Sequence, residues 1–272
     1  MIFMASIYTH HKFGLMIREK FNSDLYKVTL NYKEEYLLGQ QGPDFLFFNP
    51  KFFLKKVPPG VFIHNKSLKD FLDRNMDYLK SQPLNSPALS YTVGFICHFI
   101  LDSKIHPAVN NLSTKNYTHQ EVESELDRYL LKVDNLNPTA FHMEDLVPRN
   151  KNTFKDILPL YKSYSSIDEK SFYTSLDNFY KWKKFFHSES KIKETVILST
   201  MKILGVKSTI GGQVMRQEPL PGSAHSNKVL FNLFNSTLDL APKLIYNALD
   251  YVFKDELPDE DFYFNFNGIL NI

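Results

Sequence analysis

The chain has 272 residues, 43% of them hydrophobic, and includes 24 Phe and 15 Tyr, so it is long and apolar enough to bury a core and is not a disordered protein. Its formal net charge of +2 provides no basic field of the kind that nucleic-acid-binding proteins use, so there is no strong nucleic-acid signature. The single cysteine, Cys97, excludes an internal disulfide, and we expect it to be a buried free thiol.

Helical spacing of apolar residues dominates the first half of the chain. Glycines and prolines instead predict a long ordered loop over residues 39–62. Thr118 is expected to be an N-cap, with Glu121 completing a capping box. Helices are predicted over His10 to about Phe21, Ser67 to about Leu79, Ser86 to His106, where Pro107 should end the helix, and Thr118 to about Val133.

The second half begins with a polar, proline-containing segment at residues 138–152. Further helices are predicted over Ser166–His187 and Ser188–Leu204, followed by a loop at 208–226 and a helix at 227–253 that is broken or kinked near Pro242. We therefore predict a mainly α protein in two parts. Residues 1–137 would form a metal-binding helical core, and residues 138–272 a C-terminal helical part packed on the same domain.

Three side chains that can bind metal recur at four-residue steps within an apolar run. Residues four apart lie on one face of a helix, about 6 Å apart along its axis, so His98, Asp102 and His106 should form a polar stripe. A second pair with the same spacing, His119 and Glu123, follows. Imidazole and carboxylate ligands suit zinc. Five such residues are too many for one ion, so a cluster of at least two is expected.

Other candidate ligands come earlier in the chain: His10, Asp44 in Gly-Gln-Gln-Gly-Pro-Asp, and His64. His142, His187 and His225 have no neighbours at ligand spacing and are interpreted as surface or loop residues. The run Lys181–His187 is interpreted as a solvated helix with an aromatic core face.

This order of residues resembles the zinc-dependent phospholipase C family, relatives of secreted bacterial phosphatidylcholine-hydrolysing enzymes and of single-strand-specific zinc nucleases. The matching segments cover roughly the first half of the chain: residues 9–14 (THHKFG), 39–44 (GQQGPD), 94–107 and 119–128. The resemblance implies a multi-helix bundle with a metal cluster between its helices.

The resemblance also implies a set of ligands for two or three zinc ions. Asp44, His64, His98 and Asp102 would hold one ion. A second would bind His106, His119 and Glu123, with a position left for water. His10 and Asp102 would serve a third, with Asp102 as the bridging carboxylate. In the secreted enzymes the processed N-terminal residue also binds that third ion, whereas nine residues precede His10 here. His11 is a possible substitute ligand.

The implied activity is hydrolysis of a phosphate ester, most simply a phospholipase C-like phosphodiesterase whose substrate includes a phospholipid head group. Asp44 would orient or deprotonate the attacking water, and Asp127 would steer a ligand histidine. Phe45 would either face a cationic head group or pack within its loop, and the loop at 208–226 would shape the substrate entrance.

Two alternatives stay open: a nuclease or nucleotidase on the same scaffold, and a non-catalytic module stabilised by zinc. Such a module should have every metal position closed by protein ligands. No apolar run approaches the roughly 20 residues that span a bilayer, and no signal peptide is evident, so we expect a cytoplasmic protein. The sequence does not indicate an oligomeric state.

Overall fold

The computed structural model describes residues 6–53, 55–114, 117–149, 151–164 and 167–271, and most of them are helical. The mainly α prediction is confirmed, because two isolated bridges are the only β pairing in these residues. The α-helices are α1 (Tyr8–Arg18), α2 (Ser23–Asn31), α3 (Lys33–Gly39), α4 (Pro50–Phe53), α5 (Pro59–His64), α6 (Leu68–Ser81), α7 (Pro87–Leu112), α8 (His119–Val133), α9 (Leu158–Lys162), α10 (Glu169–Phe186), α11 (Lys191–Ile203), α12 (Lys207–Ile210) and α13 (Ser223–Lys254). Short 3₁₀ helices are η1 (Asp44–Phe48), η2 (Met143–Leu146), η3 (Lys151–Asp156), η4 (Gly211–Gln213) and η5 (Glu260–Tyr263).

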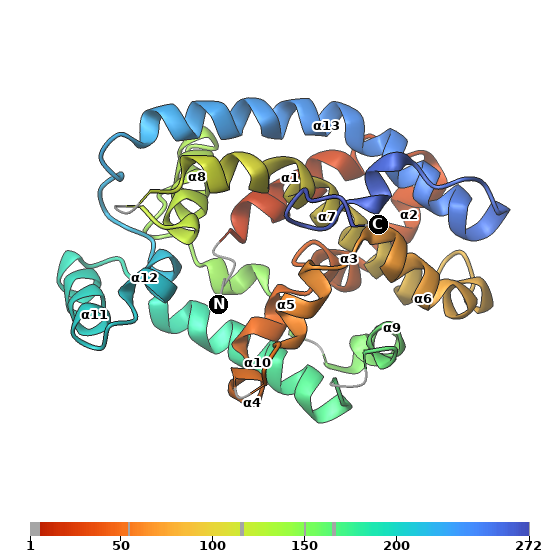
Figure 1. Ribbon diagram of the computed structural model, residues 1–272, viewed down its shortest axis with the longest axis horizontal. Coiled ribbons are helices and arrows are strands. Elements are labelled where there is room, and N and C mark those ends of the chain that lie inside the picture. Colours follow the sequence, from red (N-terminus) through yellow and green to blue (C-terminus); the bar gives the residue numbers. More distant parts are fainter. Residues whose placement is uncertain (1–5, 54, 115–116, 150, 165–166, 272) are drawn as a thin grey trace.

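The central element is α7, which packs against α1, α3, α8 and α13. In Figure 1, α13 runs along the top of the molecule and α10 along the bottom, with α1, α3, α7 and α8 between them. Because α7 is covered on all sides, its apolar residues face in every direction, and Cys97 is 1% exposed. The buried-thiol prediction for Cys97 is confirmed, and burial raises its pKa to about 12.

A close crossing of α3 and α7 fixes the start of the segment that carries Asp44. Gly94 of α7 lies against the backbone of α3, where an added Cβ would be 2.3 Å from the Tyr36 carbonyl oxygen. Gly39, the last residue of α3, meets α7 just as closely. No larger residue fits at this crossing, so the two glycines allow the chain to leave α3 directly beside the polar stripe.

The prediction that Pro107 ends the stripe helix is wrong, because α7 continues to Leu112. A proline inside a helix removes one backbone hydrogen bond, here to the carbonyl of Ser103. That carbonyl and the Pro107 ring lie against Gly268 of the C-terminal segment. Tertiary packing around a buried helix therefore outweighs the local preference of proline.

Of the two alternatives predicted near Pro242, the break is wrong, since α13 is one helix of 32 residues, and the kink stays a prediction. Pro242 cannot donate to the carbonyl of Leu238, but the Lys20 ammonium group donates to that oxygen instead, at 3.0 Å. A side chain from the other end of the sequence thus replaces the missing backbone donor.

The segment predicted as a loop at 39–62 contains η1, α4 and most of α5, and α2 and α3 were not predicted. The predicted loop at 208–226 likewise holds η4 and parts of α12 and α13. Apart from α13 these helices are short, and the many glycines and prolines mark their ends rather than exclude them. The Thr118–Glu121 capping box is confirmed.

One large hydrophobic cluster contains side chains from both halves of the chain, including Phe13 of α1, Phe99 of α7, Phe179 of α10 and Leu244 of α13. The division at residue 137 itself stays a prediction. Among the described helices, none is both long and apolar enough to cross a membrane.

Candidate metal centre

Eight polar side chains meet in the interior, contributed by five elements. They are His10 of α1, Asp44 of η1, His64 of α5, His98, Asp102 and His106 of α7, and His119 and Glu123 of α8, and they form three groups of potential ligands: His10–His98–Asp102, Asp44–His64–His98 and His106–His119–Glu123. Seven of the eight are buried, and His119 is partly exposed. The structure thus brings together all eight residues that the sequence predicted as ligands.

Asp102 occupies the middle of this cluster. Its Oδ1 lies 3.1 Å from Nε2 of His10 and 3.3 Å from Nε2 of His106. Its Oδ2 lies 3.1 Å from Nε2 of His98 and 4.0 Å from Nε2 of His64. A carboxylate with histidines against each oxygen has the placement that a bridge between two ions requires.

Two further carboxylates flank this core. Asp44 Oδ1 is 3.0 Å from Nε2 of His64 and 3.8 Å from Nε2 of His98. On the other side, Glu123 Oε1 is 3.2 Å from Nε2 of His106 and 3.4 Å from Nε2 of His119. All five histidines therefore present Nε2 toward a carboxylate.

Hydrogen bonds on the opposite ring nitrogen fix the tautomer of two histidines. Nδ1 of His64 donates to the carbonyl of Gly60 at 2.7 Å, and Nδ1 of His98 donates to the carbonyl of Gln40 at 3.1 Å. Because a carbonyl can only accept, each Nδ1 carries the proton and each Nε2 keeps its lone pair for an ion. Nδ1 of His119 lies 2.8 Å from the amide oxygen of Asn110, which acts in the same way.

Gly42 allows the Asp44 segment to approach His98. Its φ of +52° lies in the left-handed region, and an added Cβ would be 2.3 Å from the His98 ring. Any other residue would push the ring out of place, so this glycine is needed both for its backbone conformation and for space.

The ionisation of the cluster is set by its histidine–carboxylate pairs. Burial alone would raise the pKa of Asp102, but the charges of His106, His98 and His10 hold it well below its usual range. The pKa of Glu123 is lowered in the same way: burial alone would raise it, but His119 and His106 outweigh that effect. The pKa of His106 is raised to about 9, because Asp102 and Glu123 outweigh the effect of burial. Asp102 and Glu123 are thus favoured in the charged form that metal ions need.

Several inward-facing atoms lack hydrogen-bond partners within the part of the chain that the structure describes. They are Nε2 of His64, His98 and His119, Oδ1 of Asp44 and Oδ2 of Asp102. Leaving buried polar atoms unsatisfied costs about 1–3 kcal/mol each, so their convergence on one site calls for a shared ligand. Nitrogen and oxygen donors in this number fit two or three zinc ions.

The role of Asp127 differs from the predicted one. Its carboxylate accepts five hydrogen bonds from the start of α1: three from the backbone N–H groups of Ile7, Tyr8 and Thr9, and two from the hydroxyls of Ser6 and Thr9. These bonds satisfy free N–H groups at a helix terminus. Asp127 therefore supports the helix that carries His10 and does not steer a ligand ring.

Two other predictions do not fit the structure. Phe45 is fully buried and packs edge-on against Tyr161 and Phe172, so it cannot face a head group, and the packing alternative holds. His11 is not part of the cluster. Burial and the nearby charges of Lys33 and Arg18 lower its pKa to about 4.

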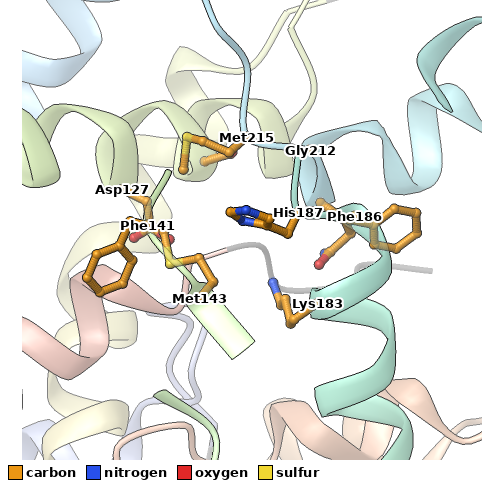
Figure 2. Close-up of a pocket in the computed structure, with 10 residues that line it drawn as sticks. Asp127, Phe141, Met143, Lys183, Phe186, His187, Gly212 and Met215 are labelled. Carbon is orange, nitrogen blue, oxygen red and sulfur yellow. The ribbon is translucent and has the colours of Figure 1, made fainter. Parts of the chain in front are cut away.

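Sequence reasoning missed Lys183, which is only 5% exposed although the run 181–187 was interpreted as solvated. Lys183 lines a small cavity together with Asp127 and Ser124 of α8, and Gly212 and Met215 close its other side (Figure 2). Burial lowers the pKa of Lys183 to about 8, and the charges of Asp127, Asp44 and Glu123 oppose that shift. A cation inside the fold thus lies within electrostatic reach of the cluster.

The interpretation of His142 and His187 as surface or loop residues is confirmed, and the fold in addition brings them together with Glu144. These residues lie 45 positions apart in the sequence, so spacing gave no signal.

Five histidines and three carboxylates gathered inside an all-α protein are the kind of ligand set that metal-dependent hydrolases use. The family model described as zinc dependent phospholipase C matches residues 9–196, and the chain belongs to this family. Searches of characterised proteins and of solved structures each find no significant match. Family membership supports a zinc-dependent hydrolase of phosphate esters.

Proposed function

We propose that this protein is a phospholipase C-like phosphodiesterase whose zinc ions are held by the eight clustered side chains. The observation that carries the proposal is the convergence of Nε2 and carboxylate oxygen atoms from η1, α5, α7 and α8 on one buried site, with no hydrogen-bond partner for them among the described residues. Building a helix core around that many polar groups is costly unless ions satisfy them.

Each ion would have its own ligand group, as the three sets of side chains suggest. Asp44, His64, His98 and Asp102 would hold one ion, and His106, His119 and Glu123 a second. His10 and Asp102 would serve a third, so Asp102 would be shared. Zinc bound in such a centre lowers the pKa of water toward neutrality and neutralises charge on phosphoryl oxygens.

The charge balance of the centre favours an anionic substrate. Asp44, Asp102 and Glu123 would offset only part of the charge of two or three divalent cations. The loaded centre would therefore keep a net positive charge that attracts a phosphodiester.

Asp44 is the carboxylate we assign to proton transfer. It lies in η1, at the edge of the cluster rather than at its middle, with Oδ1 3.0 Å from His64. It would orient the attacking water and accept its proton as the new bond to phosphorus forms. The bond from phosphorus to the leaving alcohol would then break, and the alcohol oxygen would take up the proton from Asp44, which returns to its charged form.

Lys183 is proposed to contact the phosphate of the substrate. The cavity that it lines borders α8 at Ser124, next to Glu123, and Gly212, Gln213 and Met215 of the 208–226 segment form part of its wall. That segment would then shape the entrance, as the sequence predicts. An ammonium group shielded from water interacts with a phosphate oxygen more strongly than an exposed one does.

The test is a hydrolysis assay on the full chain before and after chelation, followed by return of zinc. We expect turnover of a simple aryl phosphodiester and of phosphatidylcholine dispersed in micelles, lost on chelation and restored by zinc. Single-stranded DNA and a nucleoside monophosphate should be poor substrates. Preference for either would move the assignment to the nuclease alternative, and zinc binding with no turnover of any phosphate ester would indicate the non-catalytic module.

A further inference from the structure

A second group of metal-binding side chains lies outside the buried centre. His142 directly precedes η2, Glu144 lies within η2, and His187 is the C-cap residue of α10. One nitrogen of each histidine and one Glu144 oxygen lie within 4.8 Å of one another. None of the eight residues of the buried centre takes part, and Figure 2 shows His187 beside Met143 at the cavity that Lys183 lines.

The two histidine rings lie face to face. Their centroids are 4.2 Å apart and the ring planes differ by 20°. Stacked rings from separate segments can turn their nitrogens toward one point without a change in the backbone. His142 has a side chain 49% exposed, whereas that of His187 is 14% exposed, so the group opens to solvent on the His142 side.

Two carboxylates border the histidines. Glu144 Oε1 is 2.9 Å from Nδ1 of His142. Glu189 Oε1 is 3.4 Å from Nε2 of His187 and 4.0 Å from Nε2 of His142. Ligand atoms around a tetrahedral zinc ion lie roughly 3.3–3.5 Å apart, given bond lengths near 2.0–2.2 Å. The 2.9 Å between Glu144 Oε1 and His142 Nδ1 is close to that value, whereas Glu189 approaches the opposite ring nitrogen of His142 and is not part of the group.

Glu144 gives an independent indication that a ligand belongs here. Its side chain is 3% exposed, yet Oε2 has no hydrogen-bond partner among the residues that the structure describes. A buried carboxylate oxygen without a donor is costly, and a loop at the surface has no packing reason to hold one. A cation shared with His142 and His187 would satisfy it.

We propose that His142, Glu144 and His187 form a separate zinc site, with a fourth position left for water. Two imidazoles and a carboxylate are a ligand set that zinc accepts readily, whereas calcium and magnesium prefer oxygen ligands alone. The ion would tie η2 to the end of α10, at the cavity beside α8. Because the site is open on one side, it would bind zinc more weakly than the buried centre.

The test is equilibrium dialysis of the full chain against zinc ions, with metal and protein measured in the same sample. The variants H142A and E144Q should each bind one zinc equivalent less than the parent protein. H225A removes an exposed histidine of α13 and should bind as much zinc as the parent. Equal zinc content in all four proteins would overturn the proposal.

A second measurement uses the unaltered protein and so does not depend on how the variants fold. Crystals grown with zinc chloride should give an anomalous scattering peak between the rings of His142 and His187, in addition to peaks in the buried centre. Zinc-saturated crystals with peaks in the buried centre alone would overturn the second site while leaving the proposed phosphodiesterase function intact.

Discussion

The two histidine–carboxylate clusters of this protein are built in opposite ways. The buried centre takes most of its ligands from α7 and α8, where His98, Asp102 and His106, then His119 and Glu123, follow one another at helical steps. The cluster of His142, Glu144 and His187 instead joins a short 3₁₀ helix to the end of a distant helix, and one side of it is open to solvent.

This difference concerns preorganisation. Side chains on packed helices are held in place before an ion binds, and water is excluded around them, so the buried centre can use its charge on a substrate. Ligands on loop ends must be ordered by the ion itself, and part of the binding free energy is used for that ordering. We therefore expect chemistry at the first cluster and local stabilisation at the second.

The largest expected effect comes from changing the central carboxylate. Asp102→Asn keeps the shape of the side chain but removes the charge that faces four histidines, so zinc content should fall. The metal contributes several kcal/mol of charge stabilisation, and kcat/KM should fall by about 10³-fold or more. Elemental analysis and the phosphodiester assay measure both quantities. Asp239→Asn is the control, since the Asp239 side chain is 85% exposed and forms a surface ion pair with Lys20, far from the buried centre in character. Parent-like zinc content in D102N would contradict the central placement of Asp102.

The helix anchor at Asp127 tests whether the buried centre depends on a rigid frame. Asp127→Ala leaves the N–H groups of Ile7, Tyr8 and Thr9 without their acceptor, and we expect a loss of about 3 kcal/mol in the free energy of unfolding. Urea denaturation measures it. The control is Asp134→Ala, which removes partly exposed contacts between the same two helices and should cost under about 1 kcal/mol. Equal losses would show that α1 needs no buried anchor.

Substitution of Lys183 tests whether the cavity beside α8 is part of the substrate site. Lys183→Met should lower kcat/KM by roughly 10- to 100-fold, the effect of removing a charged hydrogen bond of about 1.5–3 kcal/mol. Lys184→Met, an exposed neighbour on α10, should stay near the parent value. Similar kinetics for both variants would remove Lys183 from the substrate site.

The same residue predicts a pH dependence. Lys183 is surrounded by Asp127, Asp44 and Glu123, and its pKa is about 8. Below that pH it is protonated and can bind phosphate, and above it the charge is lost, so kcat/KM of the parent should decline as pH rises through about 8. K183M should lack this decline. If kcat/KM of both proteins declines identically at alkaline pH, the decline belongs to a group other than Lys183.

The smallest expected effect lies in the support of a ligand ring. Asn110→Ala removes the acceptor of the His119 Nδ1–H, and outer partners of this kind change metal affinity by about 10- to 100-fold. We expect the lower end of that range, about tenfold, because this hydrogen bond is exposed. Competition with a zinc chelator measures it, with exposed Asn111→Ala as the control. Equal zinc affinities of the two variants would show that the orientation of His119 does not depend on the hydrogen bond to Asn110.

That these eight side chains lie together could be predicted because five of them follow helix geometry, and that they bind metal stays a prediction. A spacing of four residues is enough to place three of these side chains on one face of α7 and two on one face of α8. The family resemblance added His10, Asp44 and His64. Lys183 could not be found this way, because it lies in a run of lysines and only the packing of α10 decides which one is buried. His142 and His187 carry no local signal either, since only the tertiary fold brings them together.

The errors in the fold have the same origin. Pro107 was expected to end its helix and Pro242 to break or kink its own, yet both helices continue past these residues. At Pro242 the missing donor is replaced by Lys20, more than two hundred residues away in the sequence. Contacts between distant segments, which no local pattern records, outweigh the preference of a single residue.

The central claim is that the eight buried side chains form a zinc centre required for phosphodiester hydrolysis. The most direct measurement is elemental analysis of purified H142A, in which the second cluster no longer contributes, combined with the phosphodiesterase assay on the same sample. We predict two or three zinc ions per chain, with activity that disappears on chelation and returns with zinc. Less than one zinc per chain after zinc has been supplied, or activity that survives complete chelation, would contradict the account.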